Sequence, residues 1–153
     1  MIVFRLVRER FSSSLSGKGA ALRGARWNSI GVELIYTAGN RSLAMAEVAV
    51  HLTLASLPSD YLMMSIWIPD DIKVIDFSIN DLPNNWNAFP HPLSTQRIGN
   101  AFVTEAKCAI LKIPSAVTPG DFNYLINPKH PDFSRIKIES VVKFPFDRRL
   151  FGE

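Results

Sequence analysis

The sequence has very little cysteine, with Cys108 as its single thiol in 153 residues. One thiol excludes an internal disulfide and a multi-cysteine zinc site. The apolar run Ala109–Leu111 beside it indicates an inert thiol in the core. This usage is typical of a reducing compartment, so we expect a cytoplasmic protein. The histidines lack the spacing of metal ligands, and we expect no metal.

Long hydrophobic runs are missing as well. The start of the chain alternates apolar and basic residues, and it lacks the apolar core and cleavage site of an export signal. The stretch over residues 42–57 is interrupted by Glu47 and His51, and it is too short to span a bilayer. A Walker loop, a dinucleotide-binding glycine fingerprint and a nucleophile elbow are also absent. We therefore expect no membrane segment and none of the enzyme classes that these motifs define.

Positive charge is in small excess, with a net charge of +3 and a pI near 9.2. The basic residues are scattered, and no zinc-finger or RNA-binding signature accompanies them. A non-catalytic regulator that binds nucleic acid stays an alternative. A basic pocket for an anionic small molecule explains the charge equally well.

Length and composition, with 47% hydrophobic and 20% charged residues, predict one globular domain over residues 1–153. Patterning predicts a first helix over residues 41–56, capped by Asn40 and ended at Pro58. A second helix is predicted from a cap at Ser94 to about Ala106. Strands are predicted over residues 2–7, 34–37, 61–68, 72–76, 109–113 and 136–144. This order predicts an α+β fold with a mixed or antiparallel sheet and two main helices.

Glu47 is the residue that most needs an explanation. On the first predicted helix it lies in the middle of an apolar stripe, formed by Leu43, Ala46, Val50, Leu54 and Leu57. The opposite face is apolar too, so we expect a helix buried nearly all round. An unpaired buried carboxylate is costly, so Glu47 needs a cationic partner, a proton or a ligand. A structural ion pair with His51 or an arginine is one interpretation, and a carboxylate aimed into a cleft is the other.

A polar, glycine-containing segment over residues 12–29 precedes the second strand, and we expect a functional or disordered loop there. It carries two arginines, and an arginine beside glycines can hold a pyrophosphate with its planar fork. Trp27 offers a packing surface for the stem of Arg26, whereas Arg23 and Lys18 are more typical of a solvated surface.

The ordered set of these residues resembles the RES domain family. The run GARWNSIGVELIYTAGNRSLAMAEVAVH, residues 24–51, carries the family's Arg, Tyr and Glu as Arg26, Tyr36 and Glu47. The run IPSAV carries its Ser as Ser115, and NYLINP with HPDF resembles its closing segment. The resemblance covers nearly the whole chain. The chain departs from the common family pattern at Ala25, Ser29, Asn100 and Phe102.

The resemblance implies a fold similar to ADP-ribosyltransferase toxins. It implies the toxin of a type II toxin–antitoxin pair that depletes NAD by cleaving the nicotinamide–ribose bond, by hydrolysis or phosphorolysis. Transfer of ADP-ribose to a specific protein is the alternative. The implied partner is an Xre-type DNA-binding antitoxin that covers the active site, so this chain itself is expected to contact no nucleic acid.

Roles for individual residues follow from the same resemblance. Glu47 is the expected catalytic carboxylate, which stabilises the positive charge that develops on the ribose. Arg26 is expected to hold the pyrophosphate. Tyr36 is expected to stack on the nicotinamide or ribose, or else to be a core tyrosine. Ser115 and Asn127 are expected to bind NAD, Ser115 also acting in catalysis, or else to be turn residues.

Overall fold

The structure is a computed structural model that describes residues 1–152. Over these residues the chain forms seven strands and three α-helices. The strands are β1 (Ile2–Arg8), β2 (Ile35–Ala38), β3 (Tyr61–Trp67), β4 (Val74–Asp76), β5 (Ile110–Pro114), β6 (Phe122–Ile126) and β7 (Lys137–Lys143). The helices are α1 (Lys18–Arg23), α2 (Arg41–Ala49) and α3 (Leu93–Glu105). Between Met1 and Gly152 no helix has the length and apolar character needed to cross a membrane.

The seven strands form one sheet in the order β4-β5-β6-β2-β1-β3-β7. The β4–β5 pair is parallel and every other pair is antiparallel. The predicted α+β fold with a mixed sheet is therefore confirmed. The strands predicted over residues 61–68 and 72–76 exist as β3 and β4, but they lie in different halves of the sheet.

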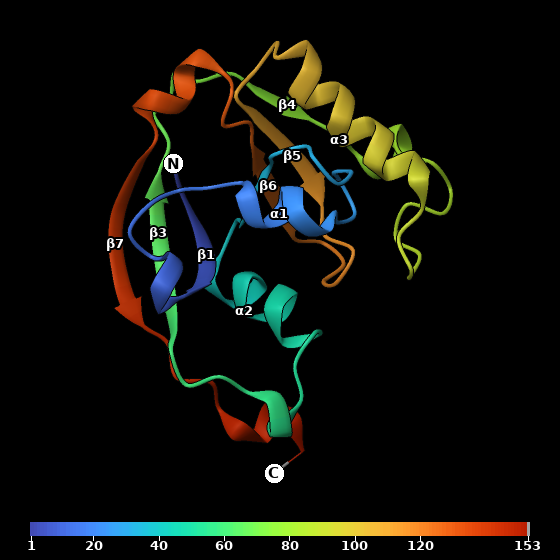
Figure 1. Cartoon of the computed structure of the whole chain (residues 1–153). Helices are drawn as coiled ribbons and strands as arrows, with labels where there is room; N and C mark the ends of the chain where they lie inside the picture. The colour runs from blue at the N-terminus through green and yellow to red at the C-terminus, as the bar shows by residue number, and fades with distance from the viewer. Residues whose placement is uncertain (153) are drawn as a thin grey trace.

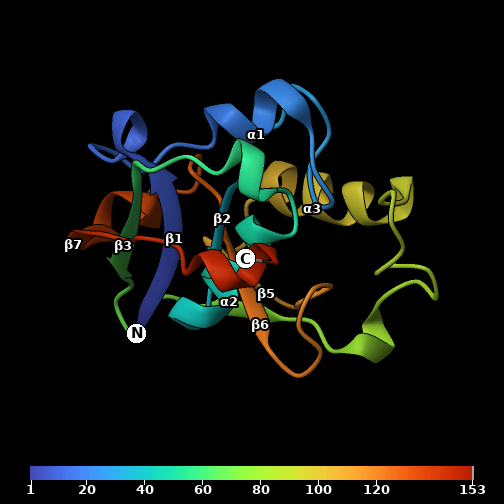
Figure 2. The same cartoon turned by 90° about the horizontal axis from the view of Figure 1, so that it is seen from below.

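The two halves of the sheet meet at one register pair, Phe4 with Ala38. In Figure 1, β1, β3 and β7 lie on one side, and β4 and β5 with α3 lie on the other. One apolar core joins the halves, because it combines residues such as Val3 and Ile66 with Ile110 and Ile126. A second core lies beneath α3 and a third beneath α2. Figure 2, the view from below, shows α2 and α3 as separate helices at different positions on the molecule.

Helix α2 is shorter than predicted. It ends at Ala49, and Leu54–Ser56 forms a separate 3-10 turn. Thr53 has extended geometry, and the Ser56 side chain caps its backbone by accepting a hydrogen bond from the Thr53 N–H at 3.1 Å. Side-chain capping of this kind competes with helix continuation, which explains why apolar periodicity overestimated the helix.

Helix α2 is also less buried than predicted. Leu43 and Ala44 are its buried residues, whereas Glu47 is half-buried and Val50 is exposed. The expectation of burial nearly all round is wrong, because periodicity does not reveal which apolar faces are covered. The Asn40 cap is confirmed: its Oδ1 accepts a hydrogen bond from the Leu43 N–H at 2.8 Å.

Two further predictions need correction. Helix α3 begins at Leu93 after Pro92, so Ser94 is not its cap; its hydroxyl is buried without a partner among residues 1–152. The segment predicted as a loop over residues 12–29 contains helix α1. This segment is ordered because Asn28, which is fully buried, donates hydrogen bonds to three backbone carbonyls around it.

Helix α3 lies directly against the loop of residues 24–34. A Cβ added at Gly99 would lie 1.6 Å from the carbonyl oxygen of Trp27, so the two backbones touch. Gln96 Nε2 also donates to the carbonyl oxygen of Asn28 at 3.1 Å. The position of this loop is therefore set by α3.

Gly99→Ala is expected to destabilise the protein by about 1–3 kcal/mol or more, because the loop must move to admit the methyl group. A thermal or urea melt measures this loss. Gly19→Ala is the matched control, because a Cβ at this helical position meets nothing within 4 Å. It is expected to be neutral or stabilising. Equal melting temperatures for Gly99→Ala and wild type would contradict the close approach.

Candidate functional site

Glu47 is held by two neutral donors. Its Oε1 accepts a hydrogen bond from Ser115 Oγ at 2.9 Å and another from Asn123 Nδ2 at 2.7 Å. Its Oε2 has no hydrogen-bond partner among residues 1–152, and no cation there forms an ion pair with it. The interpretation of Glu47 as half of a structural ion pair is therefore wrong. The arrangement fixes the carboxylate while leaving one oxygen open.

Ser115 follows β5 and is 3% exposed. Its Oγ accepts hydrogen bonds from the backbone N–H groups of Val117 (3.1 Å) and Thr118 (3.0 Å). A hydroxyl has one donor and two acceptor lone pairs, so all its capacity is used once it donates to Glu47. Ser115 is thus both a turn residue and a support for Glu47. No hydrogen-bonding capacity is left on it for a ligand.

Arg26 lies on the loop that α3 supports. Its Nη1 donates to the carbonyl oxygens of Trp86 (2.7 Å) and Ala88 (2.8 Å), which fixes one side of the guanidinium. Within the described chain, Nε and Nη2 have no hydrogen-bond partner. Burial lowers the pKa of Arg26, and the negative charge of Glu47 opposes this shift. Arg26 is therefore close enough to Glu47 to interact electrostatically, with donors left for an anion.

Tyr36, on β2, links the Arg26 loop to the sheet. Its hydroxyl donates to Asn28 Oδ1 at 2.6 Å and accepts from the Trp27 N–H at 3.1 Å. Burial raises the pKa of this hydroxyl above its ordinary value, so it stays neutral and keeps its donor. The hydroxyl is satisfied within the protein, as a core tyrosine requires, and only the ring is left to contact a ligand.

Tyr36→Phe is expected to destabilise the protein by about 1–3 kcal/mol, because the Trp27 N–H and the Asn28 Oδ1 both lose their partner. The ring stays in place, so stacking is preserved. Denaturant melts measure the loss of stability. Activity measured below the melting transition tests whether the ring still stacks on the substrate. A melt unchanged from wild type would show that water replaces the hydroxyl without cost.

Asn127 lies apart from this group. It is fully buried; its side chain donates to the Val103 carbonyl at 3.2 Å and accepts from the Lys129 N–H at 3.0 Å. It is four residues beyond Asn123, which is about 13 Å at the rise of a β-strand. The hydrogen bonds of Asn127 are those of a structural residue, and its side chain does not lie beside Glu47. Its predicted contact with NAD is therefore not supported by its position.

Asn123 joins the site, although no sequence pattern singled it out. The signal is weak, because Asn123 lies in β6 and patterning predicts no strand between residues 113 and 136. Without the strand, neither its burial nor the face it occupies is apparent. The assembled group is therefore Glu47, Ser115, Asn123, Arg26 and Tyr36.

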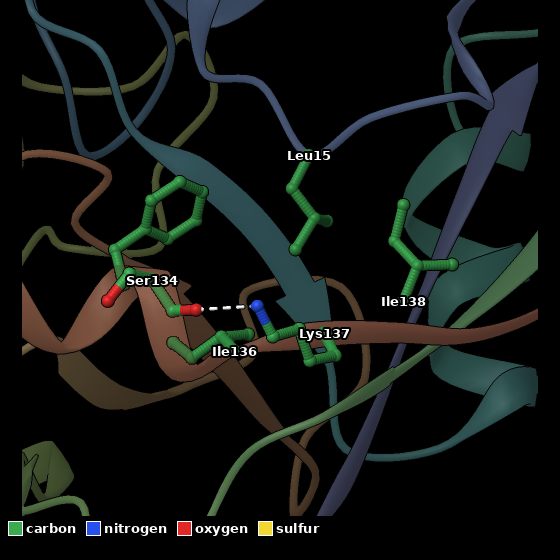
Figure 3. A pocket seen from close by; sticks show the side chains of 6 residues that line it. Leu15, Ser134, Ile136, Lys137 and Ile138 are labelled. Carbon is green, nitrogen blue, oxygen red and sulfur yellow. Dashed lines mark hydrogen bonds between the residues drawn. The ribbon is translucent and has the colours of Figure 1, made fainter.

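Two concavities of the surface lie elsewhere. One of about 320 Å³ is lined by Leu15, Phe133, Ser134, Ile136, Lys137 and Ile138. Figure 3 shows these mostly apolar side chains, with Lys137 Nζ bonded to the Ser134 carbonyl at 2.7 Å. Another of about 250 Å³ lies between β4 and α3. Neither is lined by the Glu47 group.

The other polar residues singled out in the sequence are exposed, namely Lys18, Arg23 and His51. In the part of the chain that the structure describes, no three His, Cys, Asp or Glu side chains group as metal ligands do. The group around Glu47 thus consists of one carboxylate, one guanidinium, neutral hydrogen-bond donors and an aromatic ring.

Known proteins resemble the chain over most of its length. The protein named "Prs ADP-ribosylating toxin" of Sphingobium sp. (strain YBL2) is 36% identical over 141 residues, which cover 91% of this chain and 88% of that protein. The protein named "Toxin Res" of Photorhabdus laumondii is 37% identical over 153 residues, covering 98% and 97%. A "Toxin Res" of Yersinia enterocolitica is 35% identical over the same length.

The fold also resembles a solved structure. A chain in the crystal structure of the M. tuberculosis MbcT–MbcA toxin–antitoxin complex superimposes with a TM-score of 0.76 at 20% identity. The match covers 98% of this chain and 86% of that one, and at this identity it establishes the fold alone. The family model described as "RES domain" matches residues 2–147. The chain therefore belongs to the RES domain family.

Proposed function

We propose that this protein is the toxin of a toxin–antitoxin pair and that it consumes NAD by breaking the bond between nicotinamide and ribose. The observation that carries the proposal is the fixed carboxylate of Glu47, with one oxygen open and Arg26 nearby. The names of the relatives, two of them "Toxin Res" and one an ADP-ribosylating toxin, support the same conclusion.

The chemistry requires a negative charge near the sugar. When the C–N bond breaks, nicotinamide leaves with the electron pair and positive charge develops on C1′ and the ring oxygen of the ribose, as in glycoside cleavage. The open Oε2 of Glu47 stabilises this charge, because a preorganised group pays no reorganisation at the moment of reaction. The neutral donors Ser115 and Asn123 hold the carboxylate without cancelling its charge.

The other residues bind the rest of the substrate. Arg26 places its Nε and Nη2 donors on the pyrophosphate, a planar contact that guanidinium makes better than ammonium. The ring of Tyr36 packs on the nicotinamide or ribose. Ser115 acts on Glu47 rather than on NAD, because its hydroxyl is already saturated.

The acceptor of the ADP-ribose completes the reaction. Attack by water gives ADP-ribose and a proton, whereas attack by inorganic phosphate gives ADP-ribose 1″-phosphate. A protein side chain is the third candidate acceptor, and the name of the Sphingobium relative favours it. Incubation with NAD, with and without phosphate and with a cell lysate, followed by mass spectrometry of the small molecules and proteins, separates the three acceptors.

An antitoxin must stop this reaction in the cytoplasm, where NAD is consumed. We propose an Xre-type partner that covers the Glu47–Arg26 group, since blocking the site is the direct way to prevent turnover. Expression of the toxin alone is expected to arrest growth and lower cellular NAD, and co-expression of the partner to restore both. Unimpaired growth with unchanged NAD, despite abundant folded protein, would reject the toxin function.

A further inference from the structure

We infer that Asn123 is a positioning residue that determines which oxygen of Glu47 meets the substrate. The inference rests on the proposed function of Glu47 and adds a residue to it. Asn123 Nδ2 lies 2.7 Å from Oε1, the same oxygen that Ser115 Oγ contacts at 2.9 Å. Because both donors bind Oε1, the carboxylate is held in one orientation and Oε2 is the oxygen that acts.

The backbone around Asn123 is a rigid platform. On β6 it is paired with Ala38 of β2 on one side and with Ile113 of β5 on the other. Side chains of directly paired residues share a face of the sheet, and Ala38 packs in the core that α2 covers. Asn123 therefore points at α2 from a strand bonded on both edges, and its side chain reaches Glu47 with 9% of the residue exposed.

An amide suits this task because it has no proton to lose or gain in the working range. It compensates the burial of the carboxylate with a hydrogen bond yet leaves the negative charge available to the ribose. An arginine in its place would neutralise part of that charge. Arg26 interacts with Glu47 electrostatically, and the two side chains form no ion pair.

Asn123→Ala is expected to lower kcat for NAD by about 10- to 100-fold, the usual loss when a partner that orients a reactive group is removed. KM should change by less than about twofold, since substrate binding is retained. Thr37→Val is the matched control: it removes a buried hydrogen bond, Thr37 Oγ1 to the Tyr124 carbonyl at 2.6 Å, on the opposite face of the same strand pair. It is expected to lose stability and keep kcat.

Asn123→Asp tests the contact between Asn123 and Glu47 through the pH profile of kcat, which a purely structural role of Asn123 would not change. A carboxylate at this position must share a proton with Glu47, so the acid limb of the pH profile of kcat is expected to move up by about one pH unit or more. The Thr37→Val profile should coincide with that of wild type.

Growth arrest, measured beside NAD consumption, separates the two claims. Arrest without NAD loss would reject the proposed reaction, and weakened arrest by folded Asn123→Ala would still support the positioning role. Wild-type kcat and arrest in folded Asn123→Ala, or an acid limb unmoved in Asn123→Asp, would overturn the inference. A wild-type protein that neither arrests growth nor consumes NAD would overturn both.

Discussion

Glu47→Gln is expected to lower kcat for NAD by on the order of 10²–10³, the cost of removing one preorganised electrostatic group. The glutamine keeps the shape, and its amide oxygen still accepts the hydrogen bonds from Ser115 and Asn123. NAD binding and the melting temperature are therefore expected to be retained, or the melting temperature to rise, because a carboxylate no longer has to be desolvated. Turnover, calorimetric binding and a thermal melt on one sample measure all three.

The control for this prediction is Glu139→Gln, an exposed acid on the edge strand β7. It removes the same charge far from the proposed chemistry and should leave kcat unchanged. A purely structural Glu47 predicts the reverse pattern, with lost stability and activity that falls only as the protein unfolds. A folded, fully active Glu47→Gln protein would exclude Glu47 as the catalytic carboxylate.

Arg26→Lys is expected to raise KM for NAD by roughly 10- to 100-fold with a smaller effect on kcat. Lysine keeps the charge but has no planar fork, so it cannot bond the Trp86 and Ala88 carbonyls and the pyrophosphate together. Hydrogen bonds to charged groups contribute about 1.5–3 kcal/mol each, which sets this range. Steady-state kinetics and a direct binding measurement check it.

Arg23→Lys is the matched control, since Arg23 is exposed on the same segment. Its KM and kcat should equal those of wild type. If Arg26→Lys instead lowers kcat and leaves KM and the dissociation constant of NAD unchanged, Arg26 does not act by holding the substrate.

The α+β architecture and the importance of Glu47 could be predicted from the sequence, because both depend on strong local signals. Alternating apolar residues marked β1 and β3, and Asn40 marked the start of α2. Glu47 stood out as a charge within an apolar stripe. Recognition of the family pattern added Arg26, Tyr36 and Ser115. Ser115 bonds Glu47, Arg26 interacts with it electrostatically, and Tyr36 lies against the loop that carries Arg26.

The remaining features depend on contacts between distant segments, which local patterns do not report. Strand β6 is five residues long and follows a Pro-Gly-Asp turn, so its sequence resembles a loop. Without a predicted strand, Asn123 could not be identified as a site residue. Its partners on β2 and β5 are what make it a strand. Helix α2 was overestimated for the opposite reason, because its apolar stripe continued after Thr53 had started a new turn.

Release of nicotinamide from NAD by the purified protein tests the central claim most directly. Wild-type protein is expected to release one nicotinamide for each NAD consumed, and folded Glu47→Gln protein is expected to bind NAD and release almost none. Folded wild-type protein that releases no nicotinamide, with water, phosphate and a cell lysate all supplied as acceptors, would contradict the account.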